Sequence, residues 1–402
     1  MATANDHRWV VAFAGARDSY QVPIALRESG LLQTLVTDFY APFDRELFGR
    51  ATKLLPISIR AKLGRRFNPA LPSGFVESHL NYAIKNWWDP EGWMHRVGQL
   101  GERAGQIAAT EHCSIFSYAH VATSAFSTAG PNRRVLMQMQ PHPAAVKSAL
   151  LTDEFLPEFQ DQIRNEVTWP QEVFETFSRE PGQADLCIVA SSYTRKTLAE
   201  NGVSSDRVSV IPYGVDLEFF CPGSSQRDRF SVLFVGQVCR QKGLHYLLEA
   251  WRRLDLRNTE LRIVGRFPRY KGIVTNYAQV ARFLGPLEWI GLREEYRRAD
   301  LLCLPSLSDG FGQVVLEALA CGTPALTTSS CGASDLILDR QNGFVVPAGD
   351  LEALIATLEW ASQNRDQVRQ MRASARVTAE QYPWTRFRKS IVEKLRLLTA
   401  GG

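Results

Sequence analysis

The sequence predicts an α/β protein with two doubly wound domains, each built on a largely parallel sheet. Short apolar runs alternate with helical segments in both halves of the chain, and a segment rich in Pro, Gly, Ser and charge separates the halves near residues 215–230. The length of 402 residues fits roughly two or three domains. We therefore expect a first domain at 1–214 and a second at 215–382.

Buried parallel strands are predicted wherever a short apolar run is bounded by turn residues. In the first half these runs are Val10–Ala14, Leu35–Thr37, Ile115–Tyr118, Val135–Met139 and Leu186–Ala190. In the second half they are Phe230–Val235, Leu261–Val264, Leu301–Leu304, Ala325–Thr327 and Phe344–Val346. Amphipathic helices follow at Leu351–Trp360 and Gln367–Gln381, and Pro383 separates a last helix from them.

Between residues 41 and 100 the alternation is interrupted by a basic, aromatic stretch, which we interpret as an insertion into the first domain. It contains Arg45, Arg50, Lys53, Arg60, Lys62, Arg65, Arg66, Trp87, Trp88 and Trp93. Two interpretations remain open: peripheral contact with anionic lipid, or a solvated helical face with core aromatic residues.

Composition places the chain among globular proteins, with 45% apolar and 22% charged residues. The net charge of +4 gives no indication of nucleic acid as a partner, and we expect none. The seven cysteines form no C-x-x-C pair, which indicates reduced thiols. The sequence shows neither a secretion-signal pattern nor an apolar run of roughly 18 residues, so we expect a cytoplasmic protein, with the inner face of the membrane as the site of any peripheral contact.

The segment SDGFGQVVLEALACGTPA, starting at Ser308, carries the strongest functional signal. It follows an apolar strand, turns at two glycines and enters a helix, and a helix N-terminus at the carboxyl end of a strand suits a diphosphate. Glu317 lies inside that helix, where its carboxylate can accept hydrogen bonds from vicinal hydroxyls such as those of a ribose, and Asp309 lies in the loop. The alternative is a solvated glutamate and a turn-forming aspartate. The expected donor-binding residues here are Gly310, Phe311, Gly312, Gln313, Val314 and Glu317.

A second loop, VGQVCRQKG, follows the strand Phe230–Val235. Gly236 permits close approach of the backbone to a ligand, and Lys242 can neutralise a diphosphate. An exposed surface lysine is the alternative for Lys242.

Two histidines and one loop stand at strand ends of the first domain. His120 ends IFSYAH, where it can hydrogen-bond a sugar hydroxyl or support charge at a reacting carbon. His142, in QMQPHPAAV, has a rigid turn as its equal alternative. Gly15, Arg17 and Asp18, in AFAGARDSY, are candidates for an acceptor or phosphate loop, although G-A-R-D alone is a weak nucleotide signal.

The Ser308 segment resembles the C-terminal signature of glycosyltransferase family 4. In that signature an acidic residue is followed by seven residues, then by Glu, and then by A-x-A-x-G-x-P. Asp309 and Glu317 occupy the acidic positions, with Asp309 where Glu is usual. VSVIPYGVDLEFF resembles the family's hinge, with Tyr213 where Asn is commoner. VLFVGQVCRQKGL resembles its phosphate loop, with Gln237 where Arg is usual and Arg240 as the candidate to supply that charge. LRIVG, YRRADLLCLPS and NGFVVPAGD also match.

This resemblance implies a GT-B architecture, in which two facing Rossmann-like domains enclose the active site and the last helix, 383–402, packs back on the first domain. It implies retaining transfer of a hexosyl-type group from a UDP- or GDP-linked sugar to a glycan, a glycolipid or a small molecule. His120 matches the family's active-site histidine, and the catalytic set is His120, Asp309 and Glu317.

The sequence contains no Asp-x-Asp pair and no His/Cys cluster, so we expect no metal and no cofactor. Two rival functions stay open. One is a GT-B nucleotide-sugar epimerase, and the other is a catalytically weak carbohydrate-binding protein.

Overall fold

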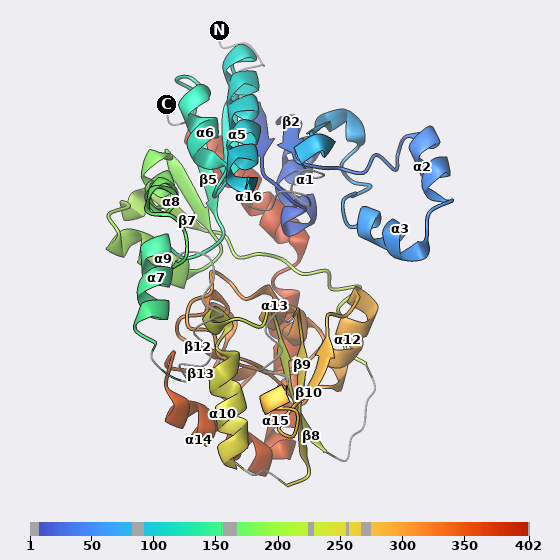
Figure 1. The fold of residues 1–402 in the computed structure, drawn as a ribbon, viewed down its shortest axis with the longest axis vertical. Coiled ribbons are helices and arrows are strands. Elements are labelled where there is room, and N and C mark those ends of the chain that lie inside the picture. Colours follow the sequence, from blue (N-terminus) through green and yellow to red (C-terminus); the bar gives the residue numbers. More distant parts are fainter. Residues whose placement is uncertain are drawn as a thin grey trace.

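The computed structural model describes residues 8–82, 92–153, 155, 167–223, 229–254, 257–266 and 275–400. These residues form two α/β domains stacked along the long axis of the molecule (Figure 1). Each domain has a parallel sheet between layers of helices, which confirms the predicted fold class.

Within the described residues, the first sheet has seven strands in the order β3-β2-β1-β4-β5-β6-β7. They are β1 (Trp9–Ala12), β2 (Leu32–Thr37), β3 (Val76–Ser78), β4 (Ser114–Tyr118), β5 (Arg134–Gln138), β6 (Leu186–Val189) and β7 (Val208–Val210). The helices around this sheet are α1 (Gln21–Glu28), α5 (Trp93–Thr110), α6 (Ala122–Thr128), α7 (Pro143–Leu151), α8 (Gln171–Gln183) and α9 (Ser192–Glu200).

The second sheet has six strands in its described part, in the order β10-β9-β8-β11-β12-β13. They are β8 (Phe230–Val235), β9 (Thr259–Val264), β10 (Arg282–Gly285), β11 (Leu301–Leu304), β12 (Ala325–Thr328) and β13 (Gly343–Val346). The helices of this domain are α10 (Leu244–Leu254), α12 (Trp289–Arg298), α13 (Gln313–Ala320), α14 (Leu351–Gln363) and α15 (Arg365–Glu380). The last helix, α16 (Trp384–Ala400), follows α15 in the chain.

All ten predicted strands are confirmed, with ends that shift by up to three residues. A continuous apolar run predicts these strands because a parallel strand covered by helices on both faces is apolar throughout. In β8, for example, every residue is buried. Three strands were missed, namely β3, β7 and β10. Each lies at a sheet edge and is short or partly polar, so it lacks the continuous apolar run that marks a central strand.

The strand order places the candidate site. In each sheet the order reverses once, between β1 and β4 in the first domain and between β8 and β11 in the second. Ligands of open α/β sheets bind at the carboxyl ends of strands beside such a reversal. The loops that follow these four strands carry Gly15, His120, Lys242 and Asp309, so the predicted residues lie at the two switch points.

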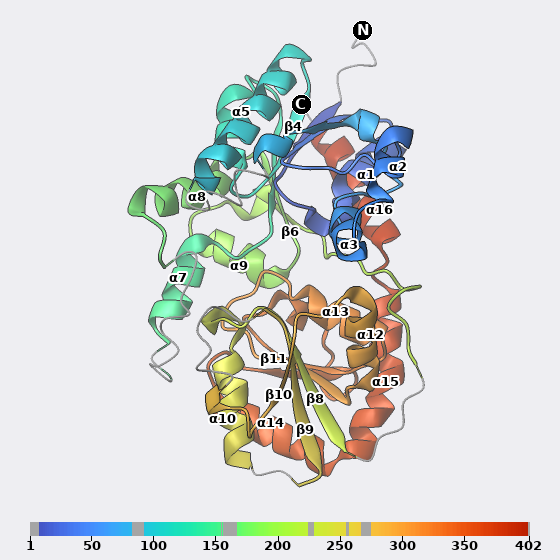
Figure 2. The ribbon, with the colours of Figure 1, turned by 45° about the vertical axis from the view of Figure 1, so that its right-hand side comes forward.

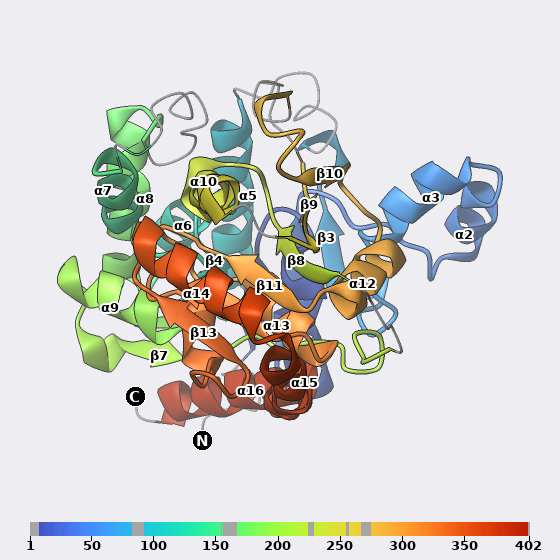
Figure 3. The same cartoon turned by 90° about the horizontal axis from the view of Figure 1, so that it is seen from below.

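The predicted insertion differs from what the structure contains. Helices α2 (Glu46–Thr52) and α3 (Ile57–Gly64) project sideways from the first domain (Figures 1 and 3). However, β3 pairs with β2, and α5, which starts at Trp93, packs against α6 and the sheet. Of the described residues in this stretch, the segment 44–65, which we call the α2–α3 arm, projects from the domain. Its ends are held in place, because Asp44 binds Ser73 and Arg65 pairs with Glu288 of the second domain. Trp87 and Trp88 lie outside the described residues.

The chain crosses between the domains twice, and the two crossings touch. The Val215 N–H donates to the Tyr382 carbonyl at 2.9 Å. Helix α16 then packs on the first domain: Arg388 binds Glu28 at 3.0 Å, and Phe387, Ile391 and Leu395 are buried in that domain's core. Figure 2 shows α15 and α16 running along one side of both domains.

Candidate active site

The loop between β11 and α13 holds the Ser308 signature. Its backbone is fixed to the loop after β12, because the Asp309 N–H donates to the Ser330 carbonyl and the Gly332 N–H donates to the Asp309 carbonyl, both at 2.9 Å. Gly312 precedes the first residue of α13 with a φ of +78°, a conformation that favours glycine. The strand, turn and helix N-terminus predicted from sequence are therefore present.

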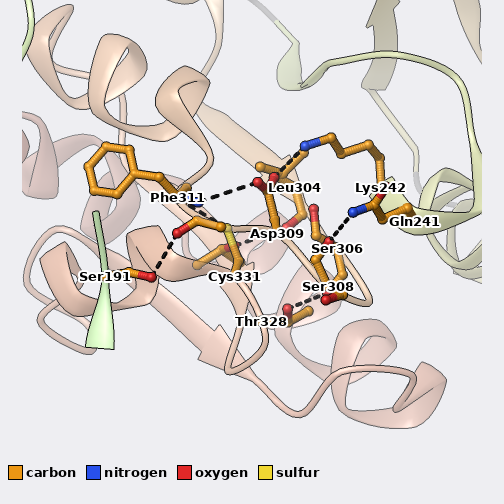
Figure 4. Close-up of polar contacts among 12 residues, drawn as sticks. Ser191, Gln241, Lys242, Leu304, Ser306, Ser308, Asp309, Phe311, Thr328 and Cys331 are labelled. Carbon is orange, nitrogen blue, oxygen red and sulfur yellow. Dashed lines mark hydrogen bonds and ion pairs between the residues drawn. The ribbon is translucent and has the colours of Figure 1, made fainter. Parts of the chain in front are cut away.

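Asp309 and Lys242 form an ion pair at the centre of this loop, with the Lys242 Nζ 2.5 Å from the Asp309 Oδ2 (Figure 4). The Asp309 side chain is 5% exposed and that of Lys242 is 23% exposed. Burial lowers the pKa of Lys242, but the neighbouring Asp309 carboxylate outweighs burial and raises it. Lys242 is thus a charged ammonium held beside the N-terminus of α13.

Glu317 lies in the second turn of α13, almost buried, and accepts a hydrogen bond from the Tyr296 hydroxyl at 2.7 Å. Burial raises the pKa of Glu317 to about 7, because desolvation disfavours the carboxylate more than the hydrogen bond favours it. Near neutral pH this group carries a proton part of the time. Its environment is therefore not that of a solvated surface glutamate.

The second loop, between β8 and α10, approaches the signature loop closely. Gly243 has a φ of +68°, and a Cβ there would lie 1.8 Å from the Pro305 carbonyl oxygen. Gln241 ties the loops together, because its Nε2 donates to the Ser308 carbonyl at 2.9 Å (Figure 4). A Cβ on Gly236, by contrast, would make only ordinary contacts of 3.5 Å or more.

Arg240 does not lie where the prediction needs it. Its guanidinium is fully buried and pairs with Asp153 of the first domain at 2.7 Å. Asp153 also accepts a hydrogen bond from Tyr246 at 2.8 Å and lies 3.0 Å from the His245 Nε2. The guanidinium of Arg240 is already paired with the Asp153 carboxylate, so Arg240 does not replace the arginine that the family usually has at position 237. Gln237 itself is exposed.

His120 lies in the turn after β4 with a φ of +80°. Its ring packs against Phe177, Trp169 and Trp93, with centroids 4.5, 5.5 and 6.0 Å away. Burial, with a further contribution from the charge of Arg17, lowers the pKa of His120 to about 4. The imidazole is therefore neutral at physiological pH, with one nitrogen as a hydrogen-bond donor and the other as an acceptor.

His142 has both ring nitrogens bound to the protein. Its Nδ1 accepts from the Ala144 N–H at 3.2 Å, and its Nε2 lies 3.0 Å from the Ser178 carbonyl. It caps the N-terminus of α7, and burial lowers its pKa. This geometry matches the rigid-turn alternative rather than a residue that binds an acceptor.

The loop after β1 holds three consecutive non-glycine residues at positive φ, namely Asp18, Ser19 and Tyr20. Asp38 accepts from the Gly15 N–H at 2.8 Å and thereby anchors the start of the loop. The Tyr118 hydroxyl donates to Asp18, and burial raises the pKa of Asp18 to about 7. Strained backbone of this kind concentrates at functional sites.

First-domain residues at the start of α9 contact the signature loop directly. The Gly310 carbonyl accepts from the hydroxyls of Ser191 at 2.7 Å and Thr194 at 3.1 Å. A Cβ on Gly310 would lie 2.0 Å from the Met139 carbonyl oxygen, at the end of β5. Glycine is therefore required here because the two domains approach each other too closely for a Cβ. No sequence motif indicated this role.

Three further predicted donor residues follow Gly310. The Phe311 ring packs on the Tyr213 ring in the interdomain crossing, with centroids 5.4 Å apart. The Gln313 Nε2 donates to the Gly214 carbonyl of the same crossing at 2.7 Å. Val314 packs against the second-domain core. The side chains of Phe311 and Gln313 thus link the loop to the hinge, and their backbones line the N-terminus of α13.

In the part of the chain that the structure describes, no three His, Cys, Asp or Glu side chains gather closely enough to hold a metal ion. Among the same residues, every helix is too short or too polar to cross a bilayer.

Comparison with known proteins agrees with this architecture. Residues 220–378 match the family described as Glycosyl transferases group 1. The chain is 30% identical to D-inositol 3-phosphate glycosyltransferases from Nocardiopsis dassonvillei, over 66% of this chain and 65% of that protein, and from Kribbella flavida, over 53% and 55%. The matches thus span between about half and two thirds of these relatives' length.

Solved structures share the whole fold at low identity. Sucrose-phosphate synthase from Thermosynechococcus elongatus superposes with a TM-score of 0.69 at 18% identity, covering 98% of this chain and 100% of that one. The Anabaena protein HepE, in complex with UDP and glucose, gives 0.63 at 14% identity, covering 97% and 99%. The chain therefore has the GT-B fold of two facing Rossmann-like domains. Its residues 220–378 are similar to the glycosyl transferases group 1 family.

Proposed function

We propose that this chain transfers a glycosyl group from a nucleotide sugar to an acceptor, with retention of anomeric configuration and without a metal ion. The observation that carries the proposal is the grouping of Lys242, the N-terminus of α13 and Glu317 around one loop. Lys242 and N–H groups at the start of the helix would hold the diphosphate, and Glu317 would accept hydrogen bonds from the ribose hydroxyls.

Asp309 has a double role in this proposal. Its carboxylate, 2.5 Å from the Lys242 Nζ, holds the ammonium where the diphosphate would bind. The same carboxylate would face the transferred sugar when the donor binds. Aspartate is one methylene shorter than the glutamate usual in this family. Its pairing with Lys242 therefore becomes the main contact expected of it.

The first domain would bind the acceptor. His120 supports this because a neutral imidazole can hydrogen-bond a sugar hydroxyl, whereas a pKa of about 4 argues against imidazolium that stabilises charge near neutral pH. The strained loop at Gly15, Arg17 and Asp18 lies at the same switch point. A glycan, a glycolipid or a small molecule bearing hydroxyls fits this role.

Metal independence is supported by the cationic groups themselves. Lys242 and the backbone of α13 supply positive potential where a divalent ion would otherwise be needed. Turnover should therefore be unchanged by EDTA. Loss of turnover in EDTA that is restored by Mg²⁺ or Mn²⁺ would contradict this part of the proposal.

Peripheral membrane contact is proposed for the α2–α3 arm. Residues 44–65 contain six basic and two acidic residues, a net charge of +4, which equals the net charge of the whole chain. Leu47 and Leu54 are 84% and 89% exposed beside them. Each basic residue near an anionic surface contributes roughly 1 kcal/mol. Sedimentation with phosphatidylserine vesicles should capture the wild type, whereas a variant with Lys53→Glu and Arg60→Glu should stay in solution.

Product analysis tests the transferase assignment against its rivals. UDP-glucose is the first donor to try, because HepE is complexed with UDP and glucose, and GDP-linked sugars follow. Transfer should require an acceptor, and proton NMR of the product should show the anomeric configuration of the donor. Conversion of the donor alone into a second nucleotide sugar would indicate an epimerase. Binding without turnover of any donor would indicate a carbohydrate-binding protein.

A further inference from the structure

Glu180 is a buried carboxylate directly beneath the turn that bears His120. It lies in the last part of α8 and is 0% exposed. We propose that Glu180 is a positioning residue that holds His120 in the conformation required for glycosyl transfer. This inference rests on the proposed function, in which His120 contacts the sugar.

The backbone of the turn is held by both oxygens of this carboxylate. The His120 N–H donates to the Glu180 Oε2 at 2.8 Å, and the Thr123 N–H donates to Oε1 at 3.1 Å. The Thr123 hydroxyl adds a longer bond to Oε1 at 3.4 Å. One side chain from a distant part of the sequence therefore satisfies several donors of one short turn.

His120 needs such support because its φ of +80° is unfavourable for a residue with a Cβ. Positive φ at a non-glycine residue is unfavourable and persists only where surrounding contacts impose it. The bond from the His120 N–H to Glu180 acts directly on this residue's own backbone.

The same helix also orients the imidazole. Phe177 lies three residues before Glu180, on the same face of α8, and its ring centroid is 4.5 Å from that of His120. α8 thus fixes the backbone of His120 through Glu180 and its ring through Phe177. Both contacts come from one helix, and sites built on helices are held more precisely than sites on loops.

A carboxylate suits this position better than an amide. Both oxygens of Glu180 accept hydrogen bonds, whereas the side chain introduced by Glu180→Gln would present an NH₂ group to one of the two backbone N–H donors. Burial raises the pKa of Glu180 to about 7 in spite of these hydrogen bonds. The protein retains a costly buried acid at this position.

The experiment compares Glu180→Gln in the wild type and in a His120→Ala background. In the wild-type background we expect kcat to fall about tenfold or more, while KM for the donor changes less than twofold, since the donor loop belongs to the other domain. In the His120→Ala background Glu180→Gln should change kcat less than twofold. Glu175→Gln, at a half-exposed position on the same helix whose side chain binds Gln171 and Arg179, is the matched control and should leave kcat unchanged.

A readout independent of activity separates this inference from the proposed function. NMR titration of the imidazoles, with the His120 signal assigned by its absence in His120→Ala, should give a His120 pKa of about 4 in the wild type. In Glu180→Gln the ring should leave its aromatic contacts, and the pKa should rise toward its ordinary value of about 6.5. Glu180→Asp, which keeps the charge but shortens the side chain, provides the comparison if Glu180→Gln does not fold, and the same shift in smaller measure is expected.

Three results would overturn the role of Glu180. They are an unchanged kcat in the folded Glu180 variant, an equal loss of kcat with and without His120, and an unchanged pKa of His120. Absence of turnover in the wild type would instead refute the proposed function, and the NMR titration would still test Glu180.

Discussion

Gly310→Ala should pull the two domains apart at the signature loop. The added Cβ would lie 2.0 Å from the Met139 carbonyl oxygen and 3.0 Å from the Gln140 Cα. Real Cβ atoms essentially never approach closer than 3.0 Å, so the loop and the end of β5 must separate by at least about 1 Å. Such a shift stretches the bonds from Ser191 and Thr194 to the Gly310 carbonyl, each worth about 1 kcal/mol of unfolding free energy.

A misplacement of about 1 Å between catalytic groups can reduce a rate about 100-fold. We therefore expect kcat to fall by about that factor and the unfolding free energy to fall by about 2 kcal/mol, as measured by steady-state kinetics and urea denaturation. Gly74→Ala is the matched control, because a Cβ there meets no atom within 4 Å and its φ is ordinary. If Gly310→Ala matched Gly74→Ala in both measurements, the interdomain role of Gly310 would be refuted.

Lys242→Met should weaken nucleotide-sugar binding at least tenfold by calorimetry, because a charge-assisted bond worth about 1.5 to 3 kcal/mol is lost; Lys196→Met, at an exposed lysine, should not. Glu317→Gln should raise the unfolding free energy of the ligand-free protein at about pH 8 by up to about 3 kcal/mol. The reason is that the pKa of Glu317 is raised to about 7 in the folded protein, so ionisation of this group lowers stability as pH rises from about 4.5 to 7. The difference should vanish near pH 4.5, and a stability gain that did not depend on pH would contradict this reasoning. Gly243→Ala should lose about 3 kcal/mol or more by denaturation, whereas Gly30→Ala, with a similar φ but open space, should lose only about 1 kcal/mol.

The parts of the fold that follow from local patterns were predictable. Apolar strands such as Phe230–Val235 and the glycine turn before Gln313 need only short-range sequence, because burial on both faces and helix capping leave local signatures. Edge strands such as β10 are half-exposed, so their composition does not distinguish them from loops.

The contacts that the sequence did not reveal join residues far apart along the chain. Asp153 is separated from Arg240 by 87 residues, and Glu180 from His120 by 60. No spacing rule links such pairs, so Arg240 could be interpreted as a free phosphate ligand although it pairs with Asp153. The role of Gly310 was also hidden in the sequence, where a glycine at this position fits a phosphate-binding turn. The packing of the two domains shows that the Met139 carbonyl leaves no room for a Cβ.

Release of nucleoside diphosphate from a panel of UDP- and GDP-linked sugars by the wild type and by Glu317→Ala tests the central claim most directly. We predict that the wild type releases nucleotide from at least one donor, faster when acceptor is present, and that Glu317→Ala loses this activity about 100-fold while remaining folded. Equal release by the two proteins, or no release by the wild type from any donor, would contradict the assignment of a nucleotide-sugar site to Lys242, α13 and Glu317.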